Sequence, residues 1–451
     1  MSLLLAYFSD HTVPKKGDLT LVTNYRGISL LPIAAKIYNR LLLNRLLPKI
    51  EPLLRKNQNG FRAGRSTLSQ ILTLRRIIEE ISNCNREAAF VFVDFSKAFD
   101  SIDRTKMFEI LALYGIPAPF IEAIKVLYTN TSSTIMTPDG ETKPIEILAG
   151  ILQGDTLAPF LFIMVLDYVL RKSLDLNNTK GFQICPRRSS RHPAIHLTDA
   201  DFADDIALIS SSVENAQVLL NSLESAANNV GLYLNETKTE YMRCSKSNDC
   251  TTVSTKKGTL LKRVDDYKYL GSFVSSSEKD FNVRKGMAWS ACNDLHQIWT
   301  SKLDPKIKVK FFRATVEPIL LYGSETWTLT VRLEKKLDGC YTRLLMRVKN
   351  LSWKTHPTLQ EIYGTLKPAS SLVRQRRTQF AGHCQRASNE IISSLILWKP
   401  LAQGKRRRKL TFPEVISRDT GLRIDELKRA MEDRNVWKSY VKSVVSTAVD
   451  K

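Results

Sequence analysis

The sequence predicts a mixed α+β fold in which a sheet covered by helices is followed by a mainly helical region. The first observation is a continuous apolar run, AAFVFV, at residues 88–93, which is typical of a strand buried on both faces. The second is that apolar strand-like segments and helical patterns alternate from there to about residue 275, which favours a sheet covered by helices. The third is the mainly helical pattern from about residue 280 onward.

The expected helices are recognised by apolar side chains that recur three and four positions apart. Leu and Ile follow this spacing through residues 33–47 and 68–81, so residues 20–80 are expected to form helices and loops. Residues 104–114 predict a helix that Gly115 ends. Two further helices are expected, one apolar almost all round and one amphipathic, at residues 160–170 and 213–230.

Length, composition and charge limit the class of protein. The 451 residues, enough for two to four domains at roughly 150 residues each, are 43% hydrophobic and 25% charged, which is too apolar for a disordered chain. Lys and Arg (67) exceed Asp and Glu (45) by 22, so the expected partner is a polyanion, most often nucleic acid and sometimes an anionic membrane surface. No apolar run reaches the roughly 18 residues that span a bilayer. We therefore expect no membrane-spanning helix and no membrane partner.

The cysteines indicate the cellular compartment. Seven Cys with no C-x-x-C spacing do not predict a disulfide framework, and we expect a reducing intracellular compartment, either nucleus or cytoplasm. Cys and His also match no usual zinc spacing.

A basic run late in the chain leaves two interpretations open. The run at residues 405–409 is either a solvated face or nuclear-import signal, or a patch that contacts phosphates.

Carboxylates stand at the ends of predicted strands. Asp94 directly follows the buried apolar run, where a charge is cheap only if it reaches solvent or binds a cation. Asp204 and Asp205 lie between the apolar segments 195–197 and 206–209, which predicts a β-hairpin with its acids at the turn. The competing interpretation of an Asp-Asp pair is an ordinary exposed turn.

Asp199 and Asp201 bring the number of aspartates within seven residues to four. Like charges this close raise each other's pKa unless a positive group lies among them, and a hard divalent cation with oxygen ligands is the simplest such group. If the two strands are neighbours, Asp94, Asp204 and Asp205 could hold two metal ions about 3.5–4 Å apart, an arrangement that clamps the attacking and leaving oxygens in phosphoryl transfer.

Three segments in chain order resemble the palm motifs of reverse transcriptases. They are FVDFSKAFD at residues 92–100, LQGDTLAP at 152–159 and FADD at 202–205. Further segments resemble two fingers motifs and the last two palm motifs of the same family, namely NYRGISL at 24–30, NGFRAGRS at 59–66, GLYLNETKT at 231–239 and YLG at 269–271. The residues of these motifs are similar to those of retrotransposons lacking long terminal repeats, the LINE type. The resemblance covers about residues 15 to 275, and the segments around Gly382 and Trp437 resemble that family's C-terminal region more weakly.

The resemblance implies a right-hand polymerase fold with fingers, a palm built on an antiparallel sheet, and a helical thumb. The implied domains are partial fingers at residues 1–87, a palm with a fingers insertion at 88–278, a thumb at 279–350 and a mainly helical basic C-terminal region at 351–451. Because the first fingers-like motif begins at Asn24, we expect a truncated element product that lacks the endonuclease.

The resemblance also implies the catalytic residues. Asp94 and Asp204 would be the principal ligands of two Mg²⁺ ions, with Mn²⁺ as a substitute, and Asp205 would complete the acidic cluster. Lys238 would protonate the leaving pyrophosphate, although a surface lysine is the competing account.

The substrate contacts implied by the resemblance lie on both sides of that cluster. Phe99 would lie beneath the incoming sugar, where a bulky ring clashes with a 2′-hydroxyl and so selects deoxynucleotides; its alternative is a plain core Phe. Arginine suits phosphate because its planar fork bonds bidentately. The remaining implied contacts are Gln153 and Gly154 with nucleotide and template, Arg26 and Lys16 with the triphosphate, and Arg62 and Arg65 with the template or its backbone. The alternative for Gln153 and Gly154 is a turn before the buried helix, and for Lys16 and Arg65 it is a solvated surface charge.

The function predicted on these grounds is that of an RNA-directed DNA polymerase. It would extend a DNA primer on an RNA template with deoxynucleoside triphosphates by two-metal phosphoryl transfer. The alternative is a catalytically inactive nucleic-acid-binding remnant of a retroelement, which explains the charge but not three intact carboxylates. An RNA-copying RNA polymerase would share the metal chemistry, and Phe99 argues against it.

Overall fold

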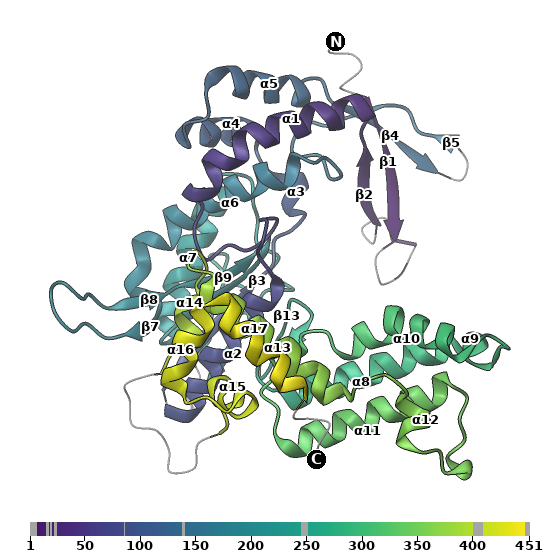
Figure 1. Ribbon diagram of the computed structural model, residues 1–451. Helices are drawn as coiled ribbons and strands as arrows, with labels where there is room; N and C mark the ends of the chain where they lie inside the picture. Colours follow the sequence, from purple (N-terminus) through teal and green to yellow (C-terminus); the bar gives the residue numbers. More distant parts are fainter. Residues whose placement is uncertain are drawn as a thin grey trace. The chain divides into compact units, whose positions relative to one another are not determined.

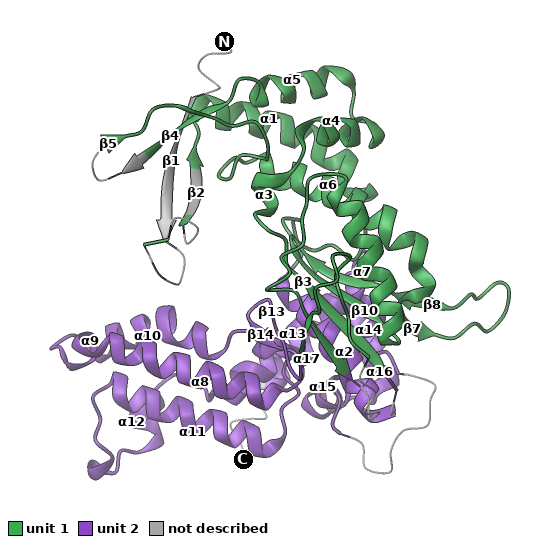
Figure 2. Ribbon diagram, turned by 180° about the vertical axis from the view of Figure 1, so that it is seen from behind, with its two compact units in different colours: residues 1–65, 88–243, 248–263 green, residues 66–87, 244–247, 264–451 purple. Residues whose placement is uncertain are grey.

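The computed structural model describes residues 7–14, 18, 20–21, 25–84, 86–137, 140–244, 251–399 and 409–446. The chain forms two compact units, and it passes between them several times (Figure 2). The first unit comprises residues 1–65, 88–243 and 248–263, and the second comprises 66–87, 244–247 and 264–451. Residues 66–87, expected within the fingers, therefore cluster with the C-terminal half; the four-domain division from the sequence stays a prediction.

The first unit contains a five-stranded sheet, of which β3 and β9 are labelled in Figure 1. Its strands, in spatial order, are β12 (Lys262–Val264), β11 (Glu240–Cys244), β3 (Ala88–Val93), β10 (Asp205–Ser210) and β9 (Asp199–Phe202). Strand β10 pairs antiparallel with both β3 and β9. Every residue of β3 is buried, which confirms the strand predicted from the apolar run at residues 88–93.

The predicted hairpin with acids at its turn is present, but its first strand differs from the prediction. The partner of β10 is β9, whereas the apolar segment at 195–197 forms β8 (Ile195–Leu197), which pairs with β7 (Phe182–Cys185). The polar-looking segment Asp199–Phe202 can be a strand because its two aspartates are buried beside an arginine from another segment. That partner is invisible in the local pattern.

The predicted helices are present. The expected helices correspond to α1 (Ile33–Ile50), α2 (Thr67–Cys84), α4 (Arg104–Leu113), α6 (Ala158–Ser173) and α7 (Val213–Asn228). All but α2 belong to the first unit, where α6 packs on α7 and α7 packs on β3 and β10. Their starts have local causes: Asp103 accepts a hydrogen bond from the backbone N–H of Lys106, and Ser212 accepts one from Asn215. The unit also contains α3 (Ala98–Ser101), α5 (Ala118–Tyr128), η2 (Glu51–Leu53) and η3 (Asp175–Lys180).

A second sheet of the first unit was not predicted. It consists of β1 (Tyr7–Pro14), β2 (Tyr25–Leu30), β4 (Ser132–Thr137), β5 (Gly140–Glu141) and β6 (Ile145–Glu146). Strand β1 pairs antiparallel with β2 and parallel with β4, which lies more than a hundred residues later. The expectation of helices and loops over 20–80 therefore missed β2, because this strand is stabilised by its pairing with β1, and such pairing leaves little trace in local periodicity.

The second unit is mainly helical, as predicted for the region after residue 280. Besides α2 it contains a short β13 (Lys268–Tyr269) and β14 (Ser272–Phe273) pair followed by helices. These helices are α8 (Ser277–Asp294), α9 (His296–Thr300), α10 (Pro305–Leu320), η4 (Ser324–Thr326), α11 (Val331–Val348), η5 (Trp353–Thr355), α12 (Leu359–Tyr363), α13 (Ala369–Arg386), α14 (Ile392–Leu395), α15 (Phe412–Thr420), α16 (Ile424–Glu432) and α17 (Arg434–Ser446). A core that includes Trp299, Phe312, Trp327 and Tyr341 joins α8 to α13.

Three general sequence expectations can be compared with this structure. Within the described ranges, no helix is both long enough and apolar enough to cross a lipid bilayer. Among the described residues, Cys185, Cys244, Cys292, Cys340 and Cys384 form no disulfide. Of the basic run at 405–409, residues 405–408 lie outside the described residues.

Candidate active site

Asp94 and Asp205 end neighbouring strands at the same edge of the central sheet. The antiparallel register pairs Val93 with Ile206, so the next residue outward on each strand is an aspartate. Asp204 directly precedes Asp205 in the chain and lies in the turn that joins β9 to β10. Carboxylates more than a hundred positions apart in the chain therefore meet at one site, as the motif order required.

The three acids influence one another electrostatically. Asp205 is exposed as a residue, but its carboxyl group is packed closely enough by protein to be partly desolvated. This desolvation, followed by the negative charges of Asp204 and Asp94, raises the pKa of Asp205 to about 6. A bound cation would offset the repulsion between these carboxylates.

Lys238 supplies one positive charge at this site. Its Nζ lies 3.4 Å from Oδ2 of Asp94. The segment that carries it runs along the end of β3, because the backbone N–H of Asn235 donates to the carbonyl of Asp94 at 2.8 Å and that of Ser96 donates to the carbonyl of Tyr233 at 2.9 Å. The lysine is therefore held beside the acids, although most of its side chain is exposed.

The donor set suits a divalent cation, although the side chains are not gathered around one point. Within the described ranges, no group of three or more His, Cys, Asp or Glu side chains is arranged to hold a metal ion. Nevertheless Oδ2 of Asp94 is buried and, among the described residues, accepts no hydrogen bond in addition to its ion pair with Lys238, and carboxylate oxygens are the ligands that hard divalent cations prefer. Asp94, Asp204 and Asp205 therefore fit such an ion by their chemistry and by their position on adjacent strands.

Phe99 lies between the core and the surface beside this edge. Its ring stacks on Phe162 of α6, with centroids 4.4 Å apart and planes 14° apart, and meets Phe61 edge-on at 6.1 Å. Phe99 is half-buried, whereas Phe61 is 55% exposed. The ring is therefore partly packed in the core, and its place beneath the incoming sugar stays a prediction.

Gln153 lines a pocket next to Phe99. Its Nε2 donates to Oδ1 of Asp100 at 3.0 Å, and its carbonyl accepts from the backbone N–H of Ser29 at 2.7 Å. The pocket has a volume of about 270 Å³ and is lined by Ser29, Asp100, Ile147 and residues 149–153. Gly154 follows with a φ of 110°, a conformation that favours glycine. The structure therefore places the motif at 152–159 directly beside the motif at 92–100.

The expected phosphate contacts are placed less favourably. Arg26 lies on β2 opposite Val13, and only its backbone is described. Lys16 lies outside the described residues. Arg62 is buried, and its guanidinium bonds Glu51 and the carbonyls of residues 55 and 58, within its own segment; its contact with a template stays a prediction. Arg65 is half-buried and also donates within the segment, to Asn59.

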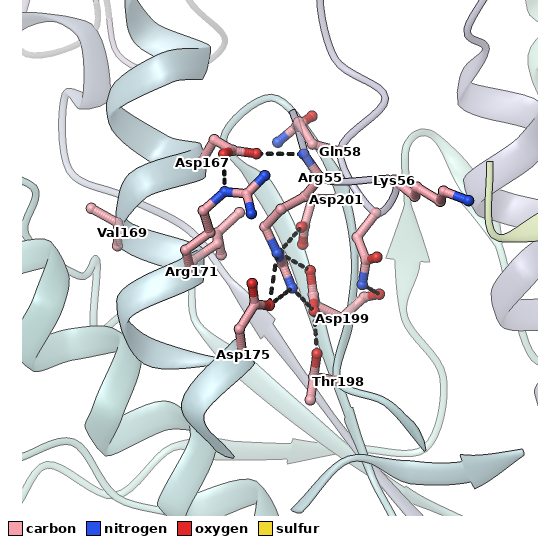
Figure 3. Close-up of polar contacts among 12 residues, drawn as sticks. Arg55, Lys56, Gln58, Asp167, Val169, Arg171, Asp175, Thr198, Asp199 and Asp201 are labelled. Carbon is pink, nitrogen blue, oxygen red and sulfur yellow. Dashed lines mark hydrogen bonds and ion pairs between the residues drawn. The ribbon is translucent and has the colours of Figure 1, made fainter. Parts of the chain in front are cut away.

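The sequence missed a buried cluster centred on Arg55 (Figure 3). Its guanidinium donates to both carboxylate oxygens of Asp199, at 2.7 and 2.8 Å, and to Asp175 at 3.0 Å. Burial opposes ionisation of Asp199, but the charge of Arg55 outweighs it and lowers the pKa to about 2. Burial, reinforced by Asp199, raises the pKa of Asp201 instead. Arg55 thus places a positive charge beside two of the four clustered aspartates, 2.7 Å from Asp199 and 3.7 Å from Asp201.

A glutamine fixes the turn that carries Asp204. The carbonyl oxygen Oε1 of Gln58 accepts hydrogen bonds from the backbone N–H groups of Ala203 and Gly60, both at 2.7 Å, and Nε2 donates to the carbonyl of Ala203 at 3.1 Å. Gln58 is fully buried, and Ala203 is held at a φ of 55°, in the left-handed region. The backbone of 57–59 also pairs with Asp201, through bonds of 2.9 and 3.1 Å. The only sequence signal was Gln58's place just before the fingers-like NGFRAGRS segment.

Comparisons with known proteins match the chain to one family. The family described as "Reverse transcriptase (RNA-dependent DNA polymerase)" matches residues 13–274, more than half of the chain. The chain is 27% identical to a Pol polyprotein of the R2 retrotransposable element of Popillia japonica, over 76% of this chain and 47% of that protein. It is 25% identical to the RNA-directed DNA polymerase of the mobile element jockey of Drosophila funebris, over 74% and 36%. The chain therefore spans half or less of these relatives.

Among solved structures, apo telomerase from Candida tropicalis is similar with a TM-score of 0.43 and 11% identity, covering 87% of this chain and 68% of that chain.

Proposed function

The chain belongs to the reverse transcriptase family, and on this basis we propose that it is an RNA-directed DNA polymerase that extends a DNA primer on an RNA template. The observation that supports the proposal is the meeting of Asp94, Asp204 and Asp205 at one sheet edge, in the motif order of the family. A protein that only binds nucleic acid gains nothing from three carboxylates directed at phosphates, because the like charges repel. The similarity of this chain to R2 and jockey proteins supports the proposal that it is a polymerase of the non-LTR retrotransposon type.

The proposed cofactor is Mg²⁺, in two ions held by the three aspartates, with Mn²⁺ as a substitute. When bound, these ions would activate the primer 3′-hydroxyl and neutralise charge on the triphosphate. The protein's own part is to present carboxylate oxygens from adjacent strands. Lys238, 3.4 Å from Asp94, is the proposed proton donor to the leaving pyrophosphate.

The nucleotide is proposed to lie along the pocket beside Phe99. Phe99 would contact the sugar and exclude a 2′-hydroxyl, while Gln153 and Gly154 would approach the base and the template. Gln153 is already oriented by Asp100 and Ser29, so a site for the nucleotide is partly pre-formed. Arg26 and Lys16 remain the proposed contacts with the triphosphate. An intracellular location, in which free cysteines are stable, is part of the same proposal.

Primer extension on an RNA template tests this function. We expect the wild-type chain to incorporate deoxynucleotides with Mg²⁺, and the substitution Asp204→Asn to reduce the rate about 1,000-fold, since a metal clamp supplies several kcal/mol to the transition state. Glu109→Gln is the matched control, because Glu109 is an exposed acid in a surface pair with Lys106 and should leave the rate unchanged. Equal rates in wild type and Asp204→Asn would contradict the assignment. Salt-sensitive RNA binding without extension would favour the inactive remnant, and a preference for ribonucleotides would favour an RNA polymerase.

A further inference from the structure

A groove in the second unit plays no part in the reaction described above. It lies between α13 and α17 and has a volume of about 830 Å³. Both helices line it with basic side chains, which are Arg376, His383 and Arg386 from α13 and Arg434, Lys438 and Lys442 from α17. Basic residues on two helices thus face one channel.

The groove is held in place by a close contact between the two helices. Trp437 of α17 lies so near Gly382 of α13 that a Cβ atom at position 382 would be only 2.2 Å from the indole ring. The indole Nε1 also donates to the carbonyl of Thr378 at 2.8 Å. Only glycine allows this approach, so the register of the two helices, and with it the placing of the basic side chains, is determined by packing.

The positive charge in the groove is poorly compensated. Among the described residues, Arg434, Lys438 and Lys442 form no ion pair, and Arg376 has only a 3.5 Å contact with Glu317. The single carboxyl group in the lining is Glu325, whose pKa is raised by burial. Burial and the nearby charge of Arg434 together lower the pKa of Arg386. Two guanidinium groups are therefore close enough to repel each other, which an anion between them would relieve.

The chemistry of the lining suits phosphates and not bases. Arginine guanidinium groups bond phosphate oxygens bidentately, and lysines add point charges. The aromatic rings of the groove are covered, with Trp437 2% and Phe380 9% exposed, so they offer little surface on which a base could stack. A ligand would be held by its backbone, without reading of its sequence.

We propose that the groove between α13 and α17 binds the phosphodiester backbone of the RNA template without sequence preference. The identity of the strand rests on the proposed function: in that reaction the RNA template moves by one nucleotide at each step. A fixed site therefore meets a different part of its sequence each time, while the template must stay bound. A site that contacts only phosphates fits such a ligand.

RNA binding by the full chain tests the groove. The variant Arg434→Glu/Lys438→Glu reverses two charges of the lining, and we expect it to weaken binding of an unstructured single-stranded RNA at least about tenfold and to reduce the slope of log K against log salt by about 1.4, or about 0.7 for each lost phosphate contact. The matched control Lys428→Glu/Arg429→Glu makes the same change of net charge on the exposed residues of α16, outside the lining, and should change affinity less than twofold. An equal loss in both variants, no loss, or a loss confined to DNA would overturn the proposal.

Two further measurements separate this inference from the polymerase proposal. Asp204→Asn should bind RNA like the wild type, and the groove variant should keep kcat while its KM for primed RNA rises. If the wild type extends no primer but the groove variant still loses RNA affinity, the polymerase proposal fails and the groove remains. If the charge-reversal variant does not fold, as judged by circular dichroism, Arg434→Gln/Lys438→Gln provides the same comparison, with about a threefold or greater loss of affinity expected.

Discussion

Gln58 holds the backbone of Ala203 from both sides, accepting a hydrogen bond from its N–H at 2.7 Å and donating one to its carbonyl at 3.1 Å. Ala203 directly precedes Asp204, so the buried amide determines the direction in which the turn presents its carboxylates. Gly60 completes the arrangement, because a Cβ atom there would lie 2.1 Å from the nitrogen of Ala203. Gln58 is thus a positioning residue that acts through the turn.

We expect Gln58→Leu to reduce kcat about 10- to 100-fold with little change in the KM for deoxynucleotides, because the acids lose their orientation and not their identity. The free energy of unfolding should fall by about 1–3 kcal/mol for the unpaired backbone groups. Gln217→Leu is the control: Gln217 makes a similar set of bonds, to Asn221 and Ser254, and should lower stability while leaving kcat unchanged. A variant of Gln58 with lost stability and an unchanged kcat would show that its role is only structural.

Replacing Arg55 should destabilise the first unit strongly. Arg55→Met leaves the carboxylate of Asp199 buried without its bidentate partner, and removal of one member of a buried pair costs about 3–5 kcal/mol. Urea unfolding measures this loss. Arg65→Met is the matched control, since Arg65 is half-buried and bonds a neighbouring carbonyl and Asn59, and should cost less than about 1 kcal/mol. Similar losses in the two variants would contradict the account of the cluster.

The acidic edge should make stability depend on pH when divalent cations are absent. The pKa of Asp205 is raised to about 6 in the folded state against an ordinary value of 3.8, so the folded state binds more protons between these values. Stability should therefore fall as pH rises from about 4 to about 6, through the titration of this group. Asp205→Asn should remove this part of the pH dependence. Thermal unfolding across pH 4–8 in a chelating buffer measures it, and identical profiles for both proteins would count against the repulsion.

Phe99 should decide the choice between ribose and deoxyribose. Phe99→Val opens space beneath the sugar, and we expect incorporation of ribonucleotides relative to deoxynucleotides to rise about 10- to 100-fold. The control is Phe162→Leu, which removes the stacking partner of Phe99 and should lower stability by about 1–3 kcal/mol without changing the preference to the same extent. If only stability responds to Phe99→Val, the ring is a core side chain.

Much of the local structure follows from patterns within short segments. The run at 88–93 is apolar at every position, so it could only be a strand or helix buried on all sides, and its length favoured the strand. The helices α4 and α7 follow from apolar spacing and from their polar caps. The position of Asp94 at the end of β3, and of the Asp204–Asp205 pair at a hairpin turn, follows from the same patterns.

Other features depend on partners that lie far away in the chain. The four clustered aspartates could not be sorted by sequence, because the group that separates them, Arg55, lies 144 residues before Asp199. The strand β1 pairs with β2 on one side and with β4, more than a hundred residues later in the chain, on the other. The bonds of Arg62 with Glu51 and with neighbouring carbonyls likewise could not be predicted from the sequence.

By itself, the sequence determined the family, the central strand and the identities of the acids at its edge, because each of these is written in the order and spacing of neighbouring residues. Only the tertiary structure decided that Asp204 and Asp205 stand beside Asp94 while Asp199 and Asp201 turn to Arg55, and that Gln58 orients their shared turn. The reason is physical: a side chain's charge state and role are set by the groups packed around it, and these come from segments that meet only when the chain has folded.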